Sequence, residues 1–454
     1  FYTAIGFAIV SLVFYSPLLD GKKLYQSDIN QYEGMSREIL ENRENFPDEI
    51  YWIDNAFGGM PTFQLGAKFA YDILSPFHML FRFIPRPAHT LFLYLLTMYI
   101  LLMVLKIPWR IAILGSIAFA FSTYLLIILQ VGHNTKALAI SYIPLVVAGL
   151  VLLRQHKLFS GFLVSLIAIS LQIRANHYQM TYYMLILLLI YFIVYLINSY
   201  RKNDLKDYLK YIGIFTLAGI LSLGLNAPNI LTTYDYSKYS TRSQSELTIN
   251  PDGSEKEKTT GLNYYYITQY SYGIFESLNL VAPRVQGGAS SEELGKNSDL
   301  YKFLIDNNIP RKQADSFISS VPTYWGNQPI LEAPAYVGAS IMFLFILALF
   351  VVKGPFKWWI LISFILSLIL SWGKNFPLLT NLFIDYFPFY NKFRAVSSIQ
   401  IILEFVVPLL SVIGLHKFLA DANLKNIRRS YAVFSVPLIL LLVFGGSLSY
   451  SGLY

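Results

Sequence analysis

The sequence of 454 residues contains no cysteine, and only 14% of its residues are charged. Without cysteine the chain forms no disulfide and has neither a thiol nucleophile nor a thiolate metal site. Soluble domains carry roughly 25% charged residues, whereas 55% of this chain is hydrophobic. A soluble core could not bury that much apolar surface, so the composition predicts that lipid surrounds most of the chain.

Several motifs of soluble enzymes are also missing from the sequence. There is no Gly-x-x-x-x-Gly-Lys-[Ser/Thr] loop and no Gly-x-Ser-x-Gly elbow, which disfavours nucleotide hydrolysis and serine-hydrolase chemistry. No His-x-x-x-His or Glu-x-x-His spacing occurs, so a transition-metal site is not expected. No repeat of fixed period is visible, and a transporter built from inverted halves would favour one.

What the sequence does contain is a series of apolar runs of about 15 to 22 residues, enough to cross a hydrocarbon layer of about 30 Å. We predict an all-α polytopic membrane protein of about eleven transmembrane helices. The first run, with no small-residue cleavage pattern after it, is interpreted as an uncleaved span. The predicted spans are residues 1–19, 89–105, 111–129, 138–153, 159–173, 180–198, 209–225, 335–352, 358–372, 396–415 and 431–448.

The basic residues indicate the orientation of these spans. Five connections contain at least two Lys or Arg each, namely residues 106–110, 154–157, 200–210, 353–357 and 417–429. The short loops 130–137 and 174–179 contain one each. The positive-inside rule then predicts a cytoplasmic amino terminus and places the second set of loops outside. The net charge of +8 thus reflects topology, and no nucleic-acid partner is expected.

Two predicted outer segments, residues 20–88 and 227–334, are too long to be simple connections. We therefore divide the chain into an N-terminal transmembrane module (1–226, with the first outer loop at 20–88), an extracytoplasmic region (227–334) and C-terminal transmembrane helices (335–454). Residues 71–83 are expected to form an interfacial helix, and 240–260 a polar patch without fixed structure. The short polar tail after the last span suggests that the natural chain continues beyond Tyr454.

Asp28 is the first candidate for chemistry, because it follows the first span by a few residues. A carboxylate tethered to a rigid helix at the outer surface suits a general base acting on a hydroxyl acceptor. The alternative is an ordinary cap of a helix over residues 29–41. A hard cation such as Mg²⁺ or Mn²⁺ at Asp28 is left open as a cofactor, since such ions need only one or two protein carboxylates.

Two short outer loops supply further polar candidates at the same membrane level. Each loop combines His, Asn and a cationic side chain, a set suited to binding a phosphate or a sugar. The alternative is polar capping of helix ends, with the cations reaching lipid headgroups. The candidates are His133, Asn134 and Lys136 in one loop and Arg174, Asn176 and His177 in the other.

The remaining candidates are scattered. Lys392 and Arg394 precede the tenth span, and Glu404 lies deep in it, where structural pairing with Arg174 or Arg394 is favoured. Trp325 lies in a segment suited to a pocket in which its ring could stack on a sugar, although aromatic belts at membrane surfaces are common. Gln31, from the same segment as Asp28, is included as a substrate-binding candidate.

Segments across most of the chain resemble the YfhO-type bacterial membrane proteins. They are QSDINQY at 26–32, GGMPT at 58–62, GHNTK at 132–136, NHYQMTY at 176–182, YWG at 324–326 and FYNKFR at 389–394. The resemblance implies a branch of the GT-C glycosyltransferase superfamily, which uses polyprenyl-phosphate-linked sugars outside the cytoplasm. It also implies a further soluble outer domain after Leu448. Asp28 then matches the catalytic carboxylate of the first outer loop. The superfamily often has two acids there, whereas the nearest acid to Asp28 is Glu33.

The resulting hypothesis is a GT-C-like glycosyltransferase of the bacterial cytoplasmic membrane with its active face outward. It would transfer a sugar from a polyprenyl-phosphate donor, in contact with membrane lipids, to an envelope glycan or glycoprotein acceptor. Asp28 would deprotonate the acceptor, while Lys136, Arg174, His177, Lys392 and Arg394 would stabilise the leaving phosphate. The alternatives are a flippase or transporter for a lipid-linked precursor and a non-catalytic scaffold for envelope assembly.

Overall fold

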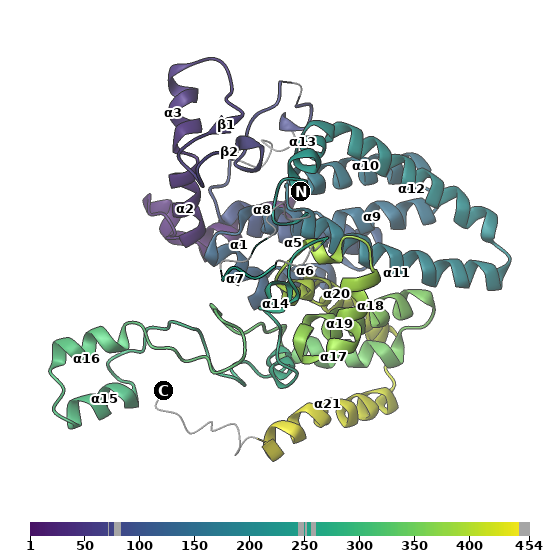
Figure 1. Cartoon of the computed structure of the whole chain (residues 1–454). Coiled ribbons are helices and arrows are strands. Elements are labelled where there is room, and N and C mark those ends of the chain that lie inside the picture. Colours follow the sequence, from purple (N-terminus) through teal and green to yellow (C-terminus); the bar gives the residue numbers. More distant parts are fainter. Residues whose placement is uncertain (71, 77–82, 244–248, 250–251, 256–259, 445–454) are drawn as a thin grey trace. The chain divides into compact units, whose positions relative to one another are not determined.

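The computed structural model describes residues 1–70, 72–76, 83–243, 249, 252–255 and 260–444 (Figure 1). These residues are mostly helical, which confirms the predicted helical class. Two short strands, β1 (Trp52–Ile53) and β2 (Met60–Pro61), pair antiparallel. Residues 71 and 77–82 of the predicted interfacial helix, and much of the polar patch at 240–260, lie outside the described residues.

The chain divides into two compact units. The first unit comprises residues 1–120, 128–263 and 388–393, and the second comprises residues 121–127, 264–387 and 394–454. Each unit is thus assembled from segments that are distant in the sequence. The N-terminal half of α7 (Thr123–Val131) belongs to the second unit and its C-terminal half to the first.

In the first unit, α10 packs against both α9 and α12, and α5 packs against α1, α6 and α9 (Figure 1). Small residues allow the closest approach, since a Cβ at Gly149 of α9 would lie 2.8 Å from the backbone nitrogen of Ser165 in α10. The helices of this unit are α1 (Tyr2–Phe14), η1 (Ser16–Asp20), α2 (Ser27–Met35), α3 (Arg37–Asn45), η2 (Thr62–Gln64), α5 (Ala88–Val104), α6 (Trp109–Ala120), α8 (Asn134–Ser141), α9 (Ile143–Arg154), α10 (Leu158–Arg174), α11 (Tyr178–Lys202), α12 (Leu205–Leu225), α13 (Ala227–Ser237) and η5 (Tyr390–Lys392).

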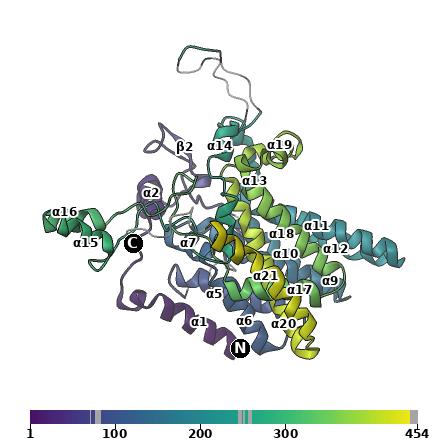
Figure 2. The same ribbon diagram turned by 90° about the horizontal axis from the view of Figure 1, so that it is seen from below.

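In the second unit, α17 packs against α20 and α21, as Figure 2 shows, and α18 packs against α20. Gly414 of α20 again permits a close contact, because a Cβ there would lie 2.2 Å from the Cβ of Ala348 in α17. The helices of this unit are α14 (Tyr264–Thr268), η3 (Phe275–Leu280), α15 (Asp299–Asp306), α16 (Arg311–Ile318), α17 (Ala339–Val351), α18 (Pro355–Ser371), η4 (Gly373–Asn375), α19 (Pro377–Tyr386), η6 (Val396–Gln400), α20 (Ile401–Ala420) and α21 (Leu424–Phe444).

Among the described residues, five helices are long and apolar enough to cross a membrane, or six if the bent pair α6 and α7 is one span. The five are Asn134–Arg154, Tyr178–Lys202, Leu205–Leu225, Val396–Ala420 and Leu424–Val443. The other predicted spans coincide with apolar helices of 10–17 residues. The chain is therefore a helical membrane protein, and the count of about eleven spans stays a prediction.

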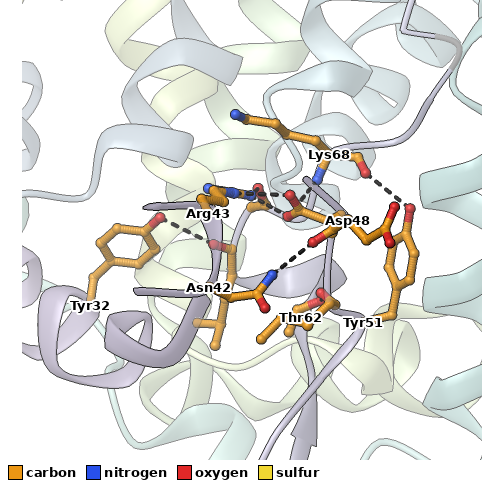
Figure 3. A network of polar contacts seen from close by, with 11 residues as sticks. Tyr32, Asn42, Arg43, Asp48, Tyr51, Thr62 and Lys68 are labelled. Carbon is orange, nitrogen blue, oxygen red and sulfur yellow. Dashed lines mark hydrogen bonds and ion pairs between the residues drawn. The ribbon is translucent and has the colours of Figure 1, made fainter. Parts of the chain in front are cut away.

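The first long segment, residues 20–88, contains a small folded region around a core of Ile39, Ile53, Ala56 and Leu65. Figure 3 shows the polar network beside this core. Arg43 of α3 forms a partly buried ion pair with Glu49, whose carboxylate also accepts a hydrogen bond from the Lys68 backbone N–H at 3.0 Å. Burial raises the pKa of Glu49, but the donors from Arg43 and Lys68 outweigh it, so the net pKa is below the usual value. The segment is thus held by specific contacts.

Candidate functional site

The first unit brings two of the predicted motifs into direct contact. Asp28 lies in the first turn of α2, and its Oδ2 is 2.8 Å from Nε2 of His133, the residue that precedes α8. The side chains remain 40% and 43% exposed, so a ligand can reach both. This pair joins the segment after the first helix to a loop more than a hundred residues further along the chain.

Gly132 makes this contact geometrically feasible. Its φ of +95° lies in the region that favours glycine, and a Cβ there would lie 2.9 Å from the Cβ of Gln26. Gln26, which precedes α2, also donates a hydrogen bond from Nε2 to the carbonyl of Leu129 in α7. The close approach of Gly132 to the buried Gln26, and the hydrogen bond of Gln26, therefore hold the two motifs together beside the Asp28–His133 pair.

His177 is the next member of the site, at the start of α11. Burial, together with the positive charge of Lys136 in the first turn of α8, lowers the pKa of its imidazole to about 3. His177 is therefore neutral at physiological pH. Because the charge of His133 also acts on it, the loops at 130–137 and 174–179 form one electrostatic cluster.

Several buried polar atoms beside this cluster have no hydrogen-bond partner among the described residues. Desolvated polar atoms without partners cost free energy, and in a binding site they indicate where a ligand supplies the missing contacts. They are Oδ1 of Asn176, Nδ1 of His177, Oγ1 of Thr181 and Oδ1 of Asn229. Three of these four residues lie within two turns at the start of α11, so the unsatisfied groups are concentrated there.

Arg174 was predicted to contact the leaving phosphate, but in the structure it is paired with a carboxylate. Its guanidinium forms an ion pair with Asp72, so a phosphate would have to displace or share that carboxylate. The expected pairing of Glu404 with Arg174 or Arg394 is wrong. The Glu404 carboxylate in the second unit accepts a hydrogen bond from Ser122 instead, and Arg394 donates to Tyr266 at 2.8 Å.

The Lys392 side chain also forms hydrogen bonds within the protein. Its ammonium donates to the backbone carbonyls of Arg242, at 2.7 Å, and of Thr260, while the Arg242 guanidinium donates back to the Lys392 carbonyl. Burial lowers the pKa of Lys392. Arg242 was not among the predicted residues, yet its charge lowers the pKa of His177 and so acts on the cluster. Its position in a long polar segment carried no signal that pointed to the site.

The other predicted residues take simpler positions. Gln31 is exposed on α2, and Asn134 is partly buried at the start of α8. Trp325 and Arg394 belong to the second unit, where the Trp325 ring packs on Gly287. Among the described residues no three His, Cys, Asp or Glu side chains gather as a metal-ligand set. A divalent cation at Asp28 stays a prediction that would rest on Asp28 and His133.

The apolar helices and the polar cluster at their ends define a helical membrane protein with a candidate binding site. The family model described as bacterial membrane protein YfhO matches residues 9–271, which is more than half of the chain. The chain belongs to the YfhO family. No curated protein and no solved structure matches it. The matched region contains Asp28, His133, Lys136 and His177, whose individual roles stay predictions.

Proposed function

We propose that the chain is a GT-C-type glycosyltransferase that moves a sugar from a polyprenyl-phosphate donor to an envelope acceptor on the outer face of the bacterial cytoplasmic membrane. The observation that carries this proposal is the Asp28–His133 pair, a reachable carboxylate held by an imidazole beside cationic side chains. The location of the pair supports the proposal, since His133 directly precedes Asn134–Arg154, a helix that is long and apolar enough to cross a membrane.

In the proposed reaction, the acceptor oxygen attacks the anomeric carbon of the sugar. The hydroxyl proton goes to Asp28, and His133 holds the carboxylate in position through its 2.8 Å contact. The bond between the anomeric carbon and the phosphate oxygen breaks, and polyprenyl phosphate leaves with that electron pair. No other co-reactant is needed for the atoms and charges to balance.

The cationic side chains support departure of the phosphate. Lys136 and Arg242 both act electrostatically on His177, so a phosphate near His177 would meet two positive charges. His177 itself would contribute as a neutral hydrogen-bonding group, because its pKa of about 3 leaves it uncharged. The unpartnered oxygens of Asn176, Thr181 and Asn229 suit sugar hydroxyl groups, which supply the missing donors.

The test is the variant Asp28→Asn, with Glu33→Gln on the same helix as the matched control. Purified proteins are incubated with a polyprenyl-phosphate sugar and a bacterial envelope fraction, and release of polyprenyl phosphate is measured. Loss of a general base typically lowers the rate by about 10²–10⁴-fold, so we expect that loss for Asp28→Asn and a near-normal rate for Glu33→Gln.

Unchanged release by a folded Asp28→Asn protein would contradict the proposal. Transbilayer movement of the lipid-linked sugar without its cleavage, in both variants alike, would instead favour a flippase. Circular dichroism and elution as a single species establish that each variant is folded.

A further inference from the structure

A second candidate site lies in the first unit, away from Asp28. An open cavity of about 390 Å³ lies between the C-terminal ends of α5 and α9. Its walls are apolar and include Ile100, Met103, Val104 and Leu152, and two lysines, Lys106 and Lys157, line it as well. The volume falls in the range of ligand sites, which is about 300–1,000 Å³.

Two adjacent turns build the charged side of this cavity. Lys106 follows α5 with a φ of +60°, and Lys157 precedes α10. The side chain of Gln155, in the second turn, donates a hydrogen bond to the carbonyl of Val104 at 2.9 Å and so joins the two turns. The spacing of the two lysines is therefore fixed by backbone structure, even though both side chains are exposed.

The electrostatics of the cavity favour an anion. The residues that line it contain no acidic side chain, and neither Lys106 nor Lys157 forms an ion pair with a described residue. Trp109, half exposed in the following helix with Arg110 over its ring at 5.2 Å, has the character of a side chain at the membrane surface. A cationic rim above an apolar wall thus occurs at the level of lipid headgroups.

This cavity is distinct from the candidate site at Asp28. The helical stretch Asn134–Arg154 has Lys136 at its beginning, and Gln155 follows its end. At 1.5 Å per residue these positions are separated by about 30 Å, the thickness of a hydrocarbon core. A ligand in the cavity therefore cannot contact the Asp28–His133 pair.

We propose that the cavity binds one anionic diacyl phospholipid, of which phosphatidylglycerol is the simplest example. Its phosphate lies between Lys106 and Lys157, and one acyl chain covers the wall formed by Ile100, Met103 and Leu152. A zwitterionic lipid binds less well, because its own cationic group is repelled by the two lysines. Free phosphate lacks the apolar contact and is excluded as the occupant.

The test measures lipid retention by the full chain. Protein purified in detergent is mixed with equal amounts of phosphatidylglycerol and phosphatidylcholine, and bound lipids are counted by native mass spectrometry. We expect one retained phosphatidylglycerol. The double variant Lys106→Gln, Lys157→Gln should lower its affinity about tenfold or more, because each lysine near a lipid headgroup contributes appreciably to binding.

Matched controls distinguish lipid binding in this cavity from lipid binding by exposed lysines in general. The double variant Lys202→Gln, Lys206→Gln removes two exposed lysines at another turn of the same unit and should retain the lipid. Met103→Trp, which fills the apolar wall at a 42% exposed position, should lose it with all charges intact. The proposal is overturned if phosphatidylcholine is retained as well as phosphatidylglycerol, or if the two double lysine variants lose the lipid equally. It is also overturned if inorganic phosphate displaces the lipid.

Discussion

At the scale of single residues, the contact between Asp28 and His133 depends on a glycine that carries no chemistry. Gly132 has no side chain to collide with Gln26, and its backbone takes a φ of +95° that other residues rarely adopt. Replacing it therefore disturbs the site through geometry while leaving every candidate side chain in place.

The variant Gly132→Ala tests this dependence. We expect a cost of about 1 kcal/mol from the left-handed backbone and a further loss from the contact of 2.9 Å with the Cβ of Gln26. His133 should move away from Asp28, and the rate of polyprenyl-phosphate release should fall. The measurements are that rate and the melting temperature of the purified protein.

Gly21→Ala is the matched control, because Gly21 has a φ of +74° and a Cβ added there would meet no heavy atom within 4 Å. Gly21→Ala should therefore lose only the stability that the unfavourable backbone conformation costs. If both alanine variants lose the same stability and keep the same rate, the close approach at Gly132 does not support the site.

The residue types of the candidate site were predictable, but their pairings were not. Asp28, His133 and His177 were identified from short polar segments beside apolar runs. Arg242 was missed, and Arg174 is paired with Asp72, a residue that the sequence analysis assigned to an interfacial helix. Such contacts join positions about a hundred residues apart, and local patterns do not encode them.

At the scale of elements, the Arg43–Glu49 ion pair explains how a polar segment outside the long helices keeps a fixed structure (Figure 3). The side chains are only 21% and 13% exposed, and Glu49 also accepts the Lys68 N–H. This pair is more shielded from water than an exposed pair, and removal of one partner leaves a partly shielded charge without its counterion.

Glu49→Gln should therefore destabilise residues 36–68 by about 2 kcal/mol, a typical value for hydrogen bonds to charged groups. Since the folded pKa of Glu49 is lowered, its contribution is present above the unfolded pKa of about 4.3 and is lost as the pH falls further. Hydrogen exchange of this segment at pH 7 and at lower pH measures both effects.

The exposed pair Arg37–Glu41 on the same helix provides the control. Glu41→Gln should leave the exchange of residues 36–68 unchanged, because water screens this pair. An equal effect of the two substitutions would mean that burial of the Glu49 pair does not stabilise the segment.

The sequence predicted one span over residues 111–129, whereas the structure has two helices there, α6 and α7, with a bend of 51° between them. The physical reason lies elsewhere in the chain. At the break, Thr123 donates its backbone N–H to the carbonyl of Tyr336 at 3.1 Å, and the Tyr336 N–H donates to Oγ1 of Thr123 at 2.6 Å. A partner more than two hundred residues away cannot be read from an apolar run, so the bend was not predictable.

At the scale of the whole molecule, the contact between Thr123 and Tyr336 bears on whether α17 crosses the membrane. Its 13 helical residues extend about 20 Å, which is less than the hydrocarbon core of about 30 Å. The buried residues Ala335 and Val337 precede it and lie outside any helix or strand. The backbone N–H and carbonyl of Tyr336, which lies between them, are both paired with Thr123, so these two polar groups are satisfied if the segment lies at membrane depth.

We therefore expect α17 and α18 each to cross the membrane. The absence of cysteine makes the test direct, since every introduced thiol is unique. The variants Lys312→Cys, Lys353→Cys and Lys374→Cys place thiols at exposed positions before α17, between α17 and α18, and after α18. In intact cells an impermeant maleimide should label positions 312 and 374, and it should label position 353 only after permeabilisation. If all three positions label alike, α17 and α18 do not cross the membrane, and the predicted count of about eleven spans is wrong.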